Sequence, residues 1–467
     1  MTAKSTQFGK RTFTSWLIES SGTLPLHRRM DFPEGEQGAD NSAILNKLYT
    51  ALEVGDTVCL FPEGMSRYQP GLSPLKTGVA RIMSEVLSRR QDDPNYELTL
   101  LTCSITYMHR HHFRSDLLVT FNPPVTFRPQ QCPSLLKPVE FQAIKDLTNY
   151  IAEDITSATL DAPSWDIITI ARTAARLYAP LGTNMTLGDY VRVTKMFIEG
   201  FKKSGKTWEQ VRPRSKSRSF QSDEPKTTIS SQPELIIGPT DQDIDELGKD
   251  LLSYHTTLIR LGIKDDRIRI GPLRKTIILK RMAIRGTWMI VLLLFCWPGL
   301  ILWTPVFIAS SLSAKRFKTT GPKENVWDEI AQQKLLVGLY TGLGVWLCCV
   351  VLTLPIALAT FLLIPPFMWM SLRFFEDTVS SFRAIVSLFS LLRLGPTKVK
   401  ELSELRANLH GRIMILAIYK LKLPADPEKY FLERGGREKG RVRGNWESKA
   451  RYFSITRRRK RDVGVKI

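Results

Sequence analysis

The pattern of apolar and polar positions predicts a mixed α/β part at the start of the chain. Within residues 1–130, short β-type runs alternate with stretches of helical periodicity, such as Leu75, Val79 and Ile82 on one face. Strands that alternate with helices favour a layered α/β domain. The predicted strands are Gly22–Leu26, Thr57–Phe61, Leu98–Tyr107 and Leu117–Phe121, and the predicted helices are Ser42–Leu52 and Leu75–Arg89.

The pattern becomes helical after this domain. Residues 131–202 carry apolar positions at helical spacing, among them Ile144, Leu147 and Ile151. Residues 234–285 are also predicted to be helical and end in a basic juxtamembrane stretch.

A polar, Ser-, Arg- and Lys-rich segment, residues 203–233, separates these helical parts and is typical of a disordered linker. Its run Arg214–Ser219 fits an inert solvated linker and also a phosphorylation switch, since added phosphate inverts local charge.

Two long apolar runs predict insertion into a membrane. Neither 286–314 nor 335–372 contains Asp, Glu, Lys, Arg or His, and each exceeds the roughly 20 residues that span a bilayer. Prolines interrupt both runs, and the second run suits either a tilted span or a tight hairpin. Because basic residues flank both runs, we expect a cytosol-facing chain with two membrane hairpins. Residues 373–424 are predicted to form amphipathic helices, and 425–467 form a basic tail.

Charge and cysteines agree with a membrane protein. The net charge of +21 suits an anionic membrane surface or nucleic acid, and the apolar runs favour the membrane. The basic run Arg457–Arg461 leaves attachment to nucleic acid or the nuclear envelope as a weaker alternative to a solvated or lipid-contacting tail. The six cysteines show no CxxC spacing, so neither disulfides nor a zinc site is indicated. The histidines His109, His111 and His112 are interpreted as surface residues, and no metal is expected.

Three short blocks carry the chemistry. They are 22–31 (Gly-Thr-Leu-Pro-Leu-His-Arg-Arg-Met-Asp), 54–66 (Val-Gly-Asp-Thr-Val-Cys-Leu-Phe-Pro-Glu-Gly-Met-Ser) and 72–78 (Leu-Ser-Pro-Leu-Lys-Thr-Gly). The middle block predicts a strand that enters a Phe-Pro-Glu-Gly turn, which would hold a carboxylate and a bare backbone at the end of a sheet. The sequence Phe-Pro-Glu-Gly also occurs at 32–35, but there it follows a polar segment. We therefore take Phe61–Gly64 as the functional copy.

In this order the blocks resemble the second and third blocks of the glycerolipid acyltransferase superfamily, and more closely fungal-type glycerol-3-phosphate/dihydroxyacetone-phosphate sn-1 acyltransferases. Segments from residue 10 to about 420 share the resemblance. It implies an α/β acyltransferase domain, followed by helical segments and a membrane-embedded helical region. It further implies acyl transfer from acyl-CoA, as co-substrate without a cofactor, to glycerol 3-phosphate or dihydroxyacetone phosphate. The expected location is the endoplasmic reticulum membrane, with a multi-pass chain and the acyltransferase domain in the cytosol.

The resemblance also assigns site residues. Arg28 takes the place of the arginine that binds the acceptor phosphate, a task suited to its planar fork, and Arg29 is the fallback. Glu63 and Gly64 take the third-block acceptor site, where Glu63 accepts from a substrate hydroxyl or merely caps a turn. Ser66 and Lys76 add contacts near the phosphate.

The family's first block, His-x-x-x-x-Asp, supplies the general base and is not found upstream of the second block. His27 is the only histidine before Phe61, and His27 to Asp31 is one residue too short. The resemblance therefore implies that Met1 follows directly after the family's base. Two hypotheses follow: a membrane-bound acyltransferase whose chain is cut short, or a non-catalytic membrane protein that binds substrate or lipid and regulates a partner. Neither requires nucleic acid.

Overall fold

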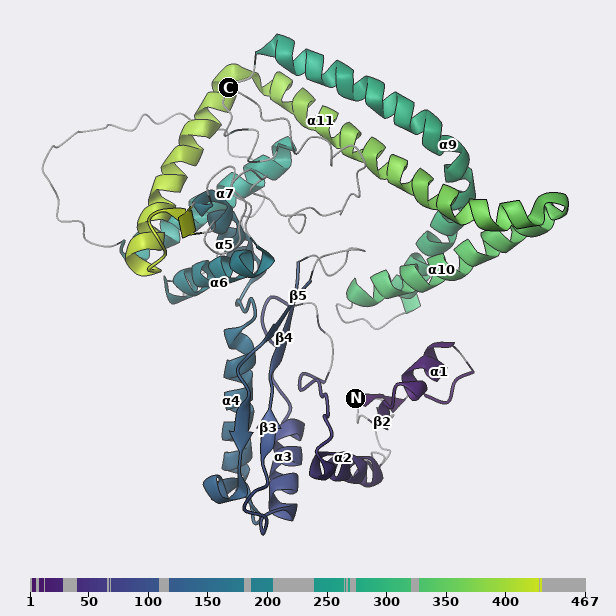
Figure 1. The fold of residues 1–467 in the computed structure, drawn as a ribbon. Coiled ribbons are helices and arrows are strands. Elements are labelled where there is room, and N and C mark those ends of the chain that lie inside the picture. Colours follow the sequence, from purple (N-terminus) through teal and green to yellow (C-terminus); the bar gives the residue numbers. More distant parts are fainter. Residues whose placement is uncertain are drawn as a thin grey trace, which may run out of the picture. The chain divides into compact units, whose positions relative to one another are not determined.

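The protein is described by a computed structural model that covers residues 2–5, 8–11, 13–27, 40–64, 67, 69–108, 117–179, 186–204, 239–263, 265, 268, 274–320, 327–427 and 429–430. The chain divides into two compact units (Figure 1), each of which is considered by itself. Unit 1 comprises Met1–Thr106 with Leu118–Thr159, and unit 2 comprises Tyr107–Leu117 with Leu160–Ile467. The expected linker therefore lies almost wholly outside the described residues, as does the tail beyond residue 430.

Unit 1 combines helices with short strand pairs. Its helices are α1 (Phe13–Ser20), α2 (Ser42–Val54), α3 (Gly78–Arg89) and α4 (Phe141–Ser157), with 3₁₀ turns η3 (Pro129–Gln131) and η4 (Pro133–Leu135). Its strands are β1 (Thr2–Lys4), β2 (Leu24–Leu26), β3 (Leu98–Leu100), β4 (Cys103–Tyr107), β5 (Leu117–Phe121) and β6 (Val125–Phe127).

The strands of the described part pair only in twos. β1 pairs with β2 in parallel, β3 pairs with β6 antiparallel, and β4 pairs with β5. The predicted strand over residues 98–107 is thus two strands with different partners, divided at Leu101 and Thr102. Helices and strands occur together as expected, but a continuous layered sheet is not found among the described residues.

The predicted strand Thr57–Phe61 is wrong as regular structure. The segment belongs to no strand, and Phe61 is 65% exposed instead of buried. Apolar side chains make a run resemble a buried strand, but a strand also requires a neighbour for its backbone groups. The segment is an irregular connection that leads from α2 into the Phe61–Gly64 turn.

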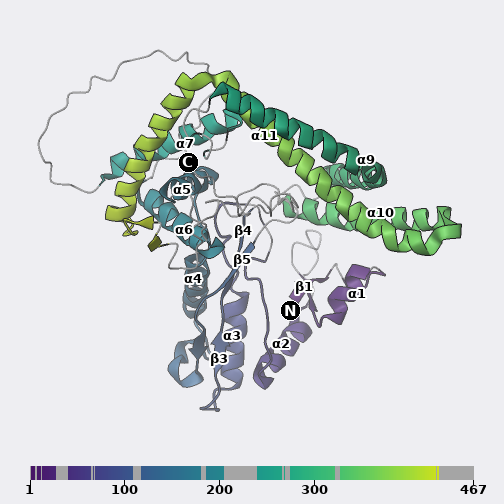
Figure 2. The same cartoon turned by 45° about the horizontal axis from the view of Figure 1, so that its top comes forward.

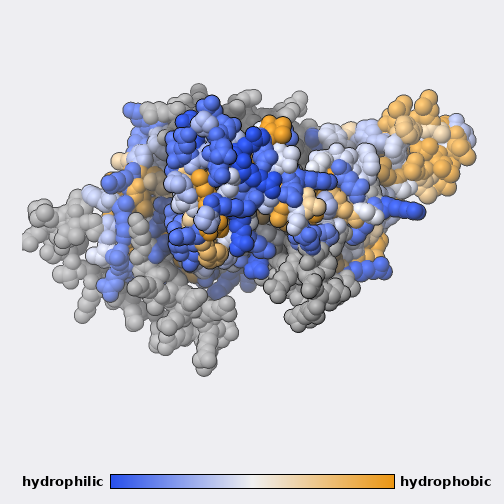
Figure 3. Space-filling model, turned by 90° about the horizontal axis from the view of Figure 1, so that it is seen from below, coloured by the Kyte–Doolittle hydropathy of each residue, from blue (hydrophilic) through white to orange (hydrophobic). Residues whose placement is uncertain are grey.

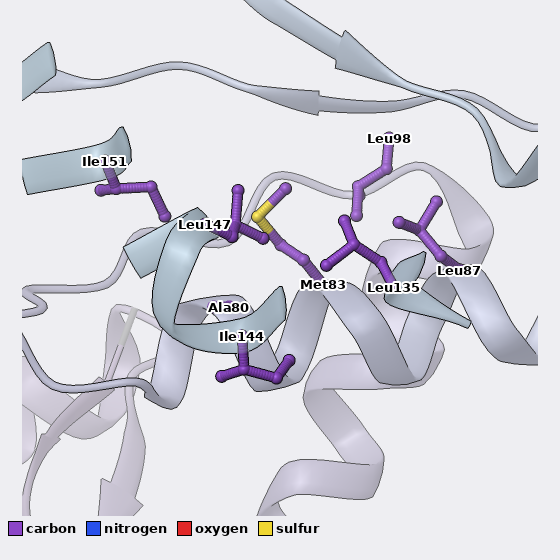
Figure 4. Packing of buried hydrophobic residues seen from close by; sticks show 8 residues of the cluster. All are labelled: Ala80, Met83, Leu87, Leu98, Leu135, Ile144, Leu147 and Ile151. Atoms are coloured by element: carbon purple, nitrogen blue, oxygen red, sulfur yellow. The ribbon is translucent and has the colours of Figure 1, made fainter. Parts of the chain in front are cut away.

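The core of unit 1 lies where α3 and α4 pack together with β3 and η4 (Figure 4). Both helices use one face with the spacing i, i+3, i+7, which places three apolar side chains on the same side of each. The core residues are Ala80, Met83, Leu87, Leu98, Leu135, Ile144, Leu147 and Ile151. Ser84 Oγ donates to the Leu135 carbonyl at 2.6 Å inside this core, so its buried hydroxyl is satisfied. This packing holds the N-terminus of α3 in place.

Unit 2 is helical. It contains α5 (Trp165–Tyr178), α6 (Leu187–Ser204), α7 (Asp241–Leu261), α9 (Lys275–Thr320), α10 (Trp327–Leu352), the 3₁₀ turn η6 (Leu354–Ile356), α11 (Ala357–Ile415) and the π-helical turn η7 (Leu416–Lys420). Gly395 has a φ of 77° and precedes Pro396, so α11 consists of two helices joined at a kink.

The helices α5, α6 and α7 form a bundle that the C-terminal part of α11 completes. Residues 244, 247, 251, 254 and 258 of α7 recur at helical spacing and are all buried. Thr240 caps α7 in a capping box with Asp243, and Gly262 ends the helix with a φ of 64°. The periodicity that predicted helices in 131–202 and 234–285 is confirmed here.

Within the described residues, three helices are long and apolar enough to cross a membrane: Lys275–Phe317, Gln333–Leu352 and Leu354–Lys420. They contain both predicted apolar runs. The second run forms a tight helical hairpin, with α10 and α11 meeting at η6 (Figure 1 and Figure 2). The first run does not form two separate helices, because α9 continues through Pro298 and Pro305 as one helix that bends. Prolines are tolerated in membrane helices where neighbouring groups satisfy the freed backbone.

A buried ion pair joins a residue before α9 to one in the C-terminal part of α11, so both apolar runs lie between its partners. Arg406 donates from Nε to Asp265 Oδ1 at 3.0 Å and from Nη2 to Oδ2 at 3.2 Å, while the Tyr254 hydroxyl donates to Oδ1 at 2.7 Å. All three side chains are buried. Burial alone would raise the pKa of Asp265, but the charge of Arg406 and the hydrogen bonds from Arg406 and Tyr254 outweigh it and hold the pKa below its usual value.

Arg406→Met is expected to destabilise the helical bundle by about 3–5 kcal/mol, because it leaves a charged carboxylate buried without a partner. Chemical unfolding of the purified full chain in detergent measures the change. Lys400→Met is the control, because the Lys400–Glu404 pair is 75% and 68% exposed and is worth at most about 1 kcal/mol. Equal effects of the two substitutions would contradict a structural role for the buried pair.

Candidate functional site

The Phe-Pro-Glu-Gly letters form a β-turn. The Gly64 amide donates to the Phe61 carbonyl at 3.1 Å, and Gly64 has a φ of 68°. Proline in the second position fixes the entry to such a turn, and glycine in the fourth is preferred because it tolerates the positive φ. Glu63 is half-buried at the turn, which is where the sequence placed a carboxylate beside bare backbone.

Lys76 lies against this turn. Its amide donates to the Pro62 carbonyl at 2.9 Å, so the chain returns to the turn just before α3. A Cβ atom built on Gly64 would lie 2.9 Å from both Cε and Nζ of Lys76, closer than side chains approach. The lysine side chain therefore crosses the space that only glycine leaves open, and the ammonium stands next to the turn.

The electrostatics at this point favour an anion. Lys76 is exposed and stands two residues before α3, whose first turn holds no acidic residue. The N-cap residue Thr77 makes no side-chain capping bond to α3. A helix N-terminus presents unsatisfied N–H groups and about half a positive charge, which suits phosphate or carboxylate. Lys76 and the N-terminus of α3 therefore both favour the binding of an anion next to the turn that contains Glu63.

Of the five predicted binding residues, the structure brings three together: Glu63, Gly64 and Lys76. Arg28, its fallback Arg29 and Ser66 lie outside the described residues, so their places in the site stay predictions. The repeated letters at 32–35 and the histidines at 109–112 also lie outside them.

One His-x-x-x-x-Asp pair lies downstream of the second block, where a search limited to the upstream segment does not find it. The spacing His-x-x-x-x-Asp occurs once in the chain, at His111 and Asp116, downstream of the Glu63 turn. A scan of the whole chain for this spacing finds it. Both residues lie outside the described ones, and no role follows from the spacing alone.

Two protein families match the chain in sequence. Residues 1–106 match a family described as acyltransferase, and residues 239–421 match one described as the glycerol-3-phosphate acyltransferase 2 C-terminal domain. The first match contains the Glu63 turn and Lys76. The second contains α7, the membrane helices and the Asp265–Arg406 pair.

Curated relatives agree with these matches. An uncharacterized acyltransferase of Schizosaccharomyces pombe is 28% identical over 392 residues, which cover 79% of this chain and 52% of the relative. Glycerol-3-phosphate O-acyltransferases 1 and 2 of Saccharomyces cerevisiae are 24% identical over 307 residues and 25% over 311, and each match covers 64% of this chain and 36% of the relative. The chain thus spans between a third and about half of the length of these relatives. No solved structure matches it.

The N-terminal match and the turn it contains define the chain as a member of the acyltransferase superfamily. The C-terminal match and the two yeast relatives narrow this assignment. Within the superfamily, the chain belongs to the fungal-type glycerol-3-phosphate acyltransferases.

Gly64→Ala is expected to weaken the contact between the turn and Lys76. A non-glycine residue in the left-handed region costs about 1–2 kcal/mol, and the new methyl group would displace the lysine side chain. Hydrogen exchange at the Lys76 amide, which Pro62 protects, should therefore speed up by about tenfold or more.

Gly78→Ala is the matched control, because a Cβ on Gly78 meets nothing within 4 Å. It is expected to leave exchange at Lys76 unchanged. Unchanged exchange in Gly64→Ala as well would show that the turn does not depend on glycine.

Proposed function

We propose that this chain takes part in the transfer of an acyl group from acyl-CoA to the sn-1 hydroxyl of glycerol 3-phosphate. Dihydroxyacetone phosphate is the alternative acceptor. The observation that carries the proposal is the contact of Lys76 with Gly64, which sets an ammonium group beside the Phe61–Gly64 turn, two residues before α3. The family assignment and the names of the two yeast relatives supply the reaction class.

On the acceptor side, Lys76 and the α3 N-terminus bind the phosphate. The phosphate carries close to two negative charges, and charge-assisted bonds to it are the strongest that the site offers. Arg28 adds a bidentate contact, and Ser66 donates from its hydroxyl. Glu63 accepts from a hydroxyl of the glycerol backbone and so orients the acceptor, while Gly64 lets the backbone approach it.

In the reaction, the acceptor hydroxyl loses its proton to a base as its oxygen attacks the thioester carbonyl carbon. The tetrahedral intermediate then collapses, the C–S bond breaks, and the CoA thiolate leaves and takes up a proton. No residue of the described part is proposed as the base, since no His-x-x-x-x-Asp block precedes the second block. We therefore propose that the described residues bind the acceptor and that turnover needs a base that they do not supply.

The membrane helices fit a product that enters the bilayer. An acylated glycerol phosphate is amphipathic, so a site next to a membrane releases it where it partitions. We propose the endoplasmic reticulum membrane as the location, with unit 1 on the cytosolic side. The apolar helices and the basic residues at their ends support membrane attachment.

A non-catalytic role is the second candidate function. The absence of a His-x-x-x-x-Asp block upstream of the second block favours it. In this role the chain retains the phosphate site and the membrane helices, and it regulates a partner through bound substrate or lipid. The two functions share the binding step and differ only in turnover.

Lys76→Met is expected to weaken glycerol 3-phosphate binding by about tenfold, since one charge-assisted contact of roughly 1.4 kcal/mol is lost. Calorimetry of the purified full chain in detergent measures the affinity, with glycerol as the ligand that lacks phosphate. Lys145→Met removes an exposed lysine of α4 and serves as the control.

Equal affinities of the Lys76 and Lys145 variants would contradict the phosphate site. Transfer of labelled acyl groups by the unaltered chain would instead contradict the absence of a base and the non-catalytic role. His111→Ala then tests whether the downstream pair supplies that base.

A further inference from the structure

Residues before and after the membrane helices hold each other by several contacts within unit 2, which we call the clasp. Besides the buried Asp265–Arg406 pair, Arg412 Nη1 contacts Asp250 Oδ2 at 2.6 Å and Lys420 Nζ contacts Asp241 Oδ1 at 2.6 Å. The Tyr178 hydroxyl donates to the Pro424 carbonyl at 2.8 Å. In each contact one partner precedes α9 in the chain, and the other lies beyond the apolar run that ends at Leu372.

The clasp restricts how the chain passes through a membrane. Both of its halves lie on the same side, so the segments between them cross an even number of times or not at all. Between Asp265 and Arg406 lie α9, α10 and the apolar first part of α11, up to Leu372, and one crossing by each would put the halves on opposite sides. At least one helix therefore returns to the side from which it entered.

The hairpin of α10 and α11 leads the chain back to the side from which α10 entered, and the tip of the hairpin is apolar. No charged residue occurs from Leu335 to Leu372. At the tip, Leu352 is 79% exposed, Leu354 71% and Leu358 76%, and this end forms the orange cluster at the right of Figure 3. A turn that reached water on the far side would expose these leucines to it. Such a surface suits the hydrocarbon of a bilayer.

The polar groups of the tip are satisfied within the hairpin, as hydrocarbon requires. Thr353 Oγ1 donates to the Cys349 carbonyl at 2.8 Å and lies 2.7 Å from Thr360 Oγ1. The Ile356 amide donates to the Thr353 carbonyl at 2.9 Å. These bonds close the turn without water.

One hydrogen bond between α10 and α11 replaces a helical hydrogen bond that a proline cannot donate. Pro365 has no N–H, so it leaves the Phe361 carbonyl four residues earlier without its helical partner. The Trp346 indole N–H of α10 donates to this carbonyl at 3.1 Å, and the two rings lie 4.6 Å apart. The indole both satisfies the carbonyl and joins the arms.

The shorter arm of the hairpin is no longer than the hydrocarbon core is thick. The span Gln333–Leu352 has 20 residues, or roughly 30 Å of helix, which equals the thickness of the hydrocarbon core. Any tilt keeps the tip inside the core.

Because the hairpin returns, α9 must also begin and end on one face. Basic residues stand near both of its ends, Lys280, Arg281 and Arg285 at one and Lys315 and Arg316 at the other, and the prolines between them let it bend. The six residues 321–326 that join α9 to α10 reach about 20 Å at most, less than the hydrocarbon thickness.

We propose that α9, α10 and α11 insert into the bilayer from one face only, with the apolar turn Thr353–Ala357 as the deepest point and the ends of all three helices on the side of the clasp. The occupant of this apolar surface is the acyl-chain region of the membrane. The chain is then embedded without crossing, which differs from the expected multi-pass arrangement. This inference does not depend on the proposed function.

Thiol labelling tests the topology. The full chain is expressed without its six cysteines, and single cysteines are introduced as Lys249→Cys on α7, Lys323→Cys between α9 and α10, and Leu354→Cys at the tip. Sealed vesicles of known orientation are treated with a membrane-impermeant maleimide before and after permeabilisation. Lys323→Cys should react to the same extent as Lys249→Cys, from the same side, and Leu354→Cys should react from neither side until detergent dissolves the membrane.

Reaction of Lys323→Cys only from the side opposite to Lys249→Cys would overturn the proposal, because α9 would then cross. Reaction of Leu354→Cys from the opposite side in vesicles would overturn the embedded tip. Protease cleavage in the connector 321–326 of the chain with its own residues gives the same answer without substitutions, since Lys323 is a trypsin site.

Discussion

The bidentate pair between Arg406 and Asp265 is the interaction on which unit 2 depends. Its partners are 141 residues apart, and both apolar runs, 286–314 and 335–372, lie between them. A buried carboxylate without its guanidinium would cost several kcal/mol, so the two segments separate only at a large loss. Tyr254 adds a third polar group, and the set is satisfied within the bundle. This closure defines the helical unit and limits the paths that the apolar helices can take.

Contacts between two segments also organise the candidate site, on a smaller scale. The Phe61–Gly64 turn and the residues before α3 meet because Lys76 bonds to the Pro62 carbonyl and crosses over Gly64. The core around Met83 and Leu87 holds α3, and α3 in turn directs its N-terminus at the turn. The proposed phosphate site thus consists of a glycine, a lysine and a helix N-terminus that are placed by ordinary packing.

The features that sequence reasoning predicted well are those with a local physical cause. Helical periodicity located α3 and the face that carries Ile82, and apolar length located the membrane helices around Pro298 and Pro355. The turn at Glu63 was also predicted, because proline and glycine have strong local preferences.

Features that depend on distant partners were not predicted. The run Thr57–Phe61 has the composition of a strand but lacks a paired neighbour, and residues 98–107 divide because the two halves meet different partners. The contact of Arg406 with Asp265 has no signal in a single sequence, since each residue alone resembles a solvated charge. The path of α9 through Pro298 was misjudged for a related reason: packing, not propensity, decides whether a membrane helix continues past proline.

The central claim is that the segments before and after the membrane helices meet while the chain is in a bilayer. Short-range cross-linking of Asp241→Cys with Lys420→Cys tests it, in the otherwise cysteine-free chain in membranes, because the native side chains meet at 2.6 Å across 179 residues. The structure predicts an efficient intramolecular cross-link by a short bifunctional maleimide, which is lost when the chain is denatured first. Failure to cross-link in the membrane, with both cysteines reactive, would contradict the clasp and the one-sided insertion that follows from it.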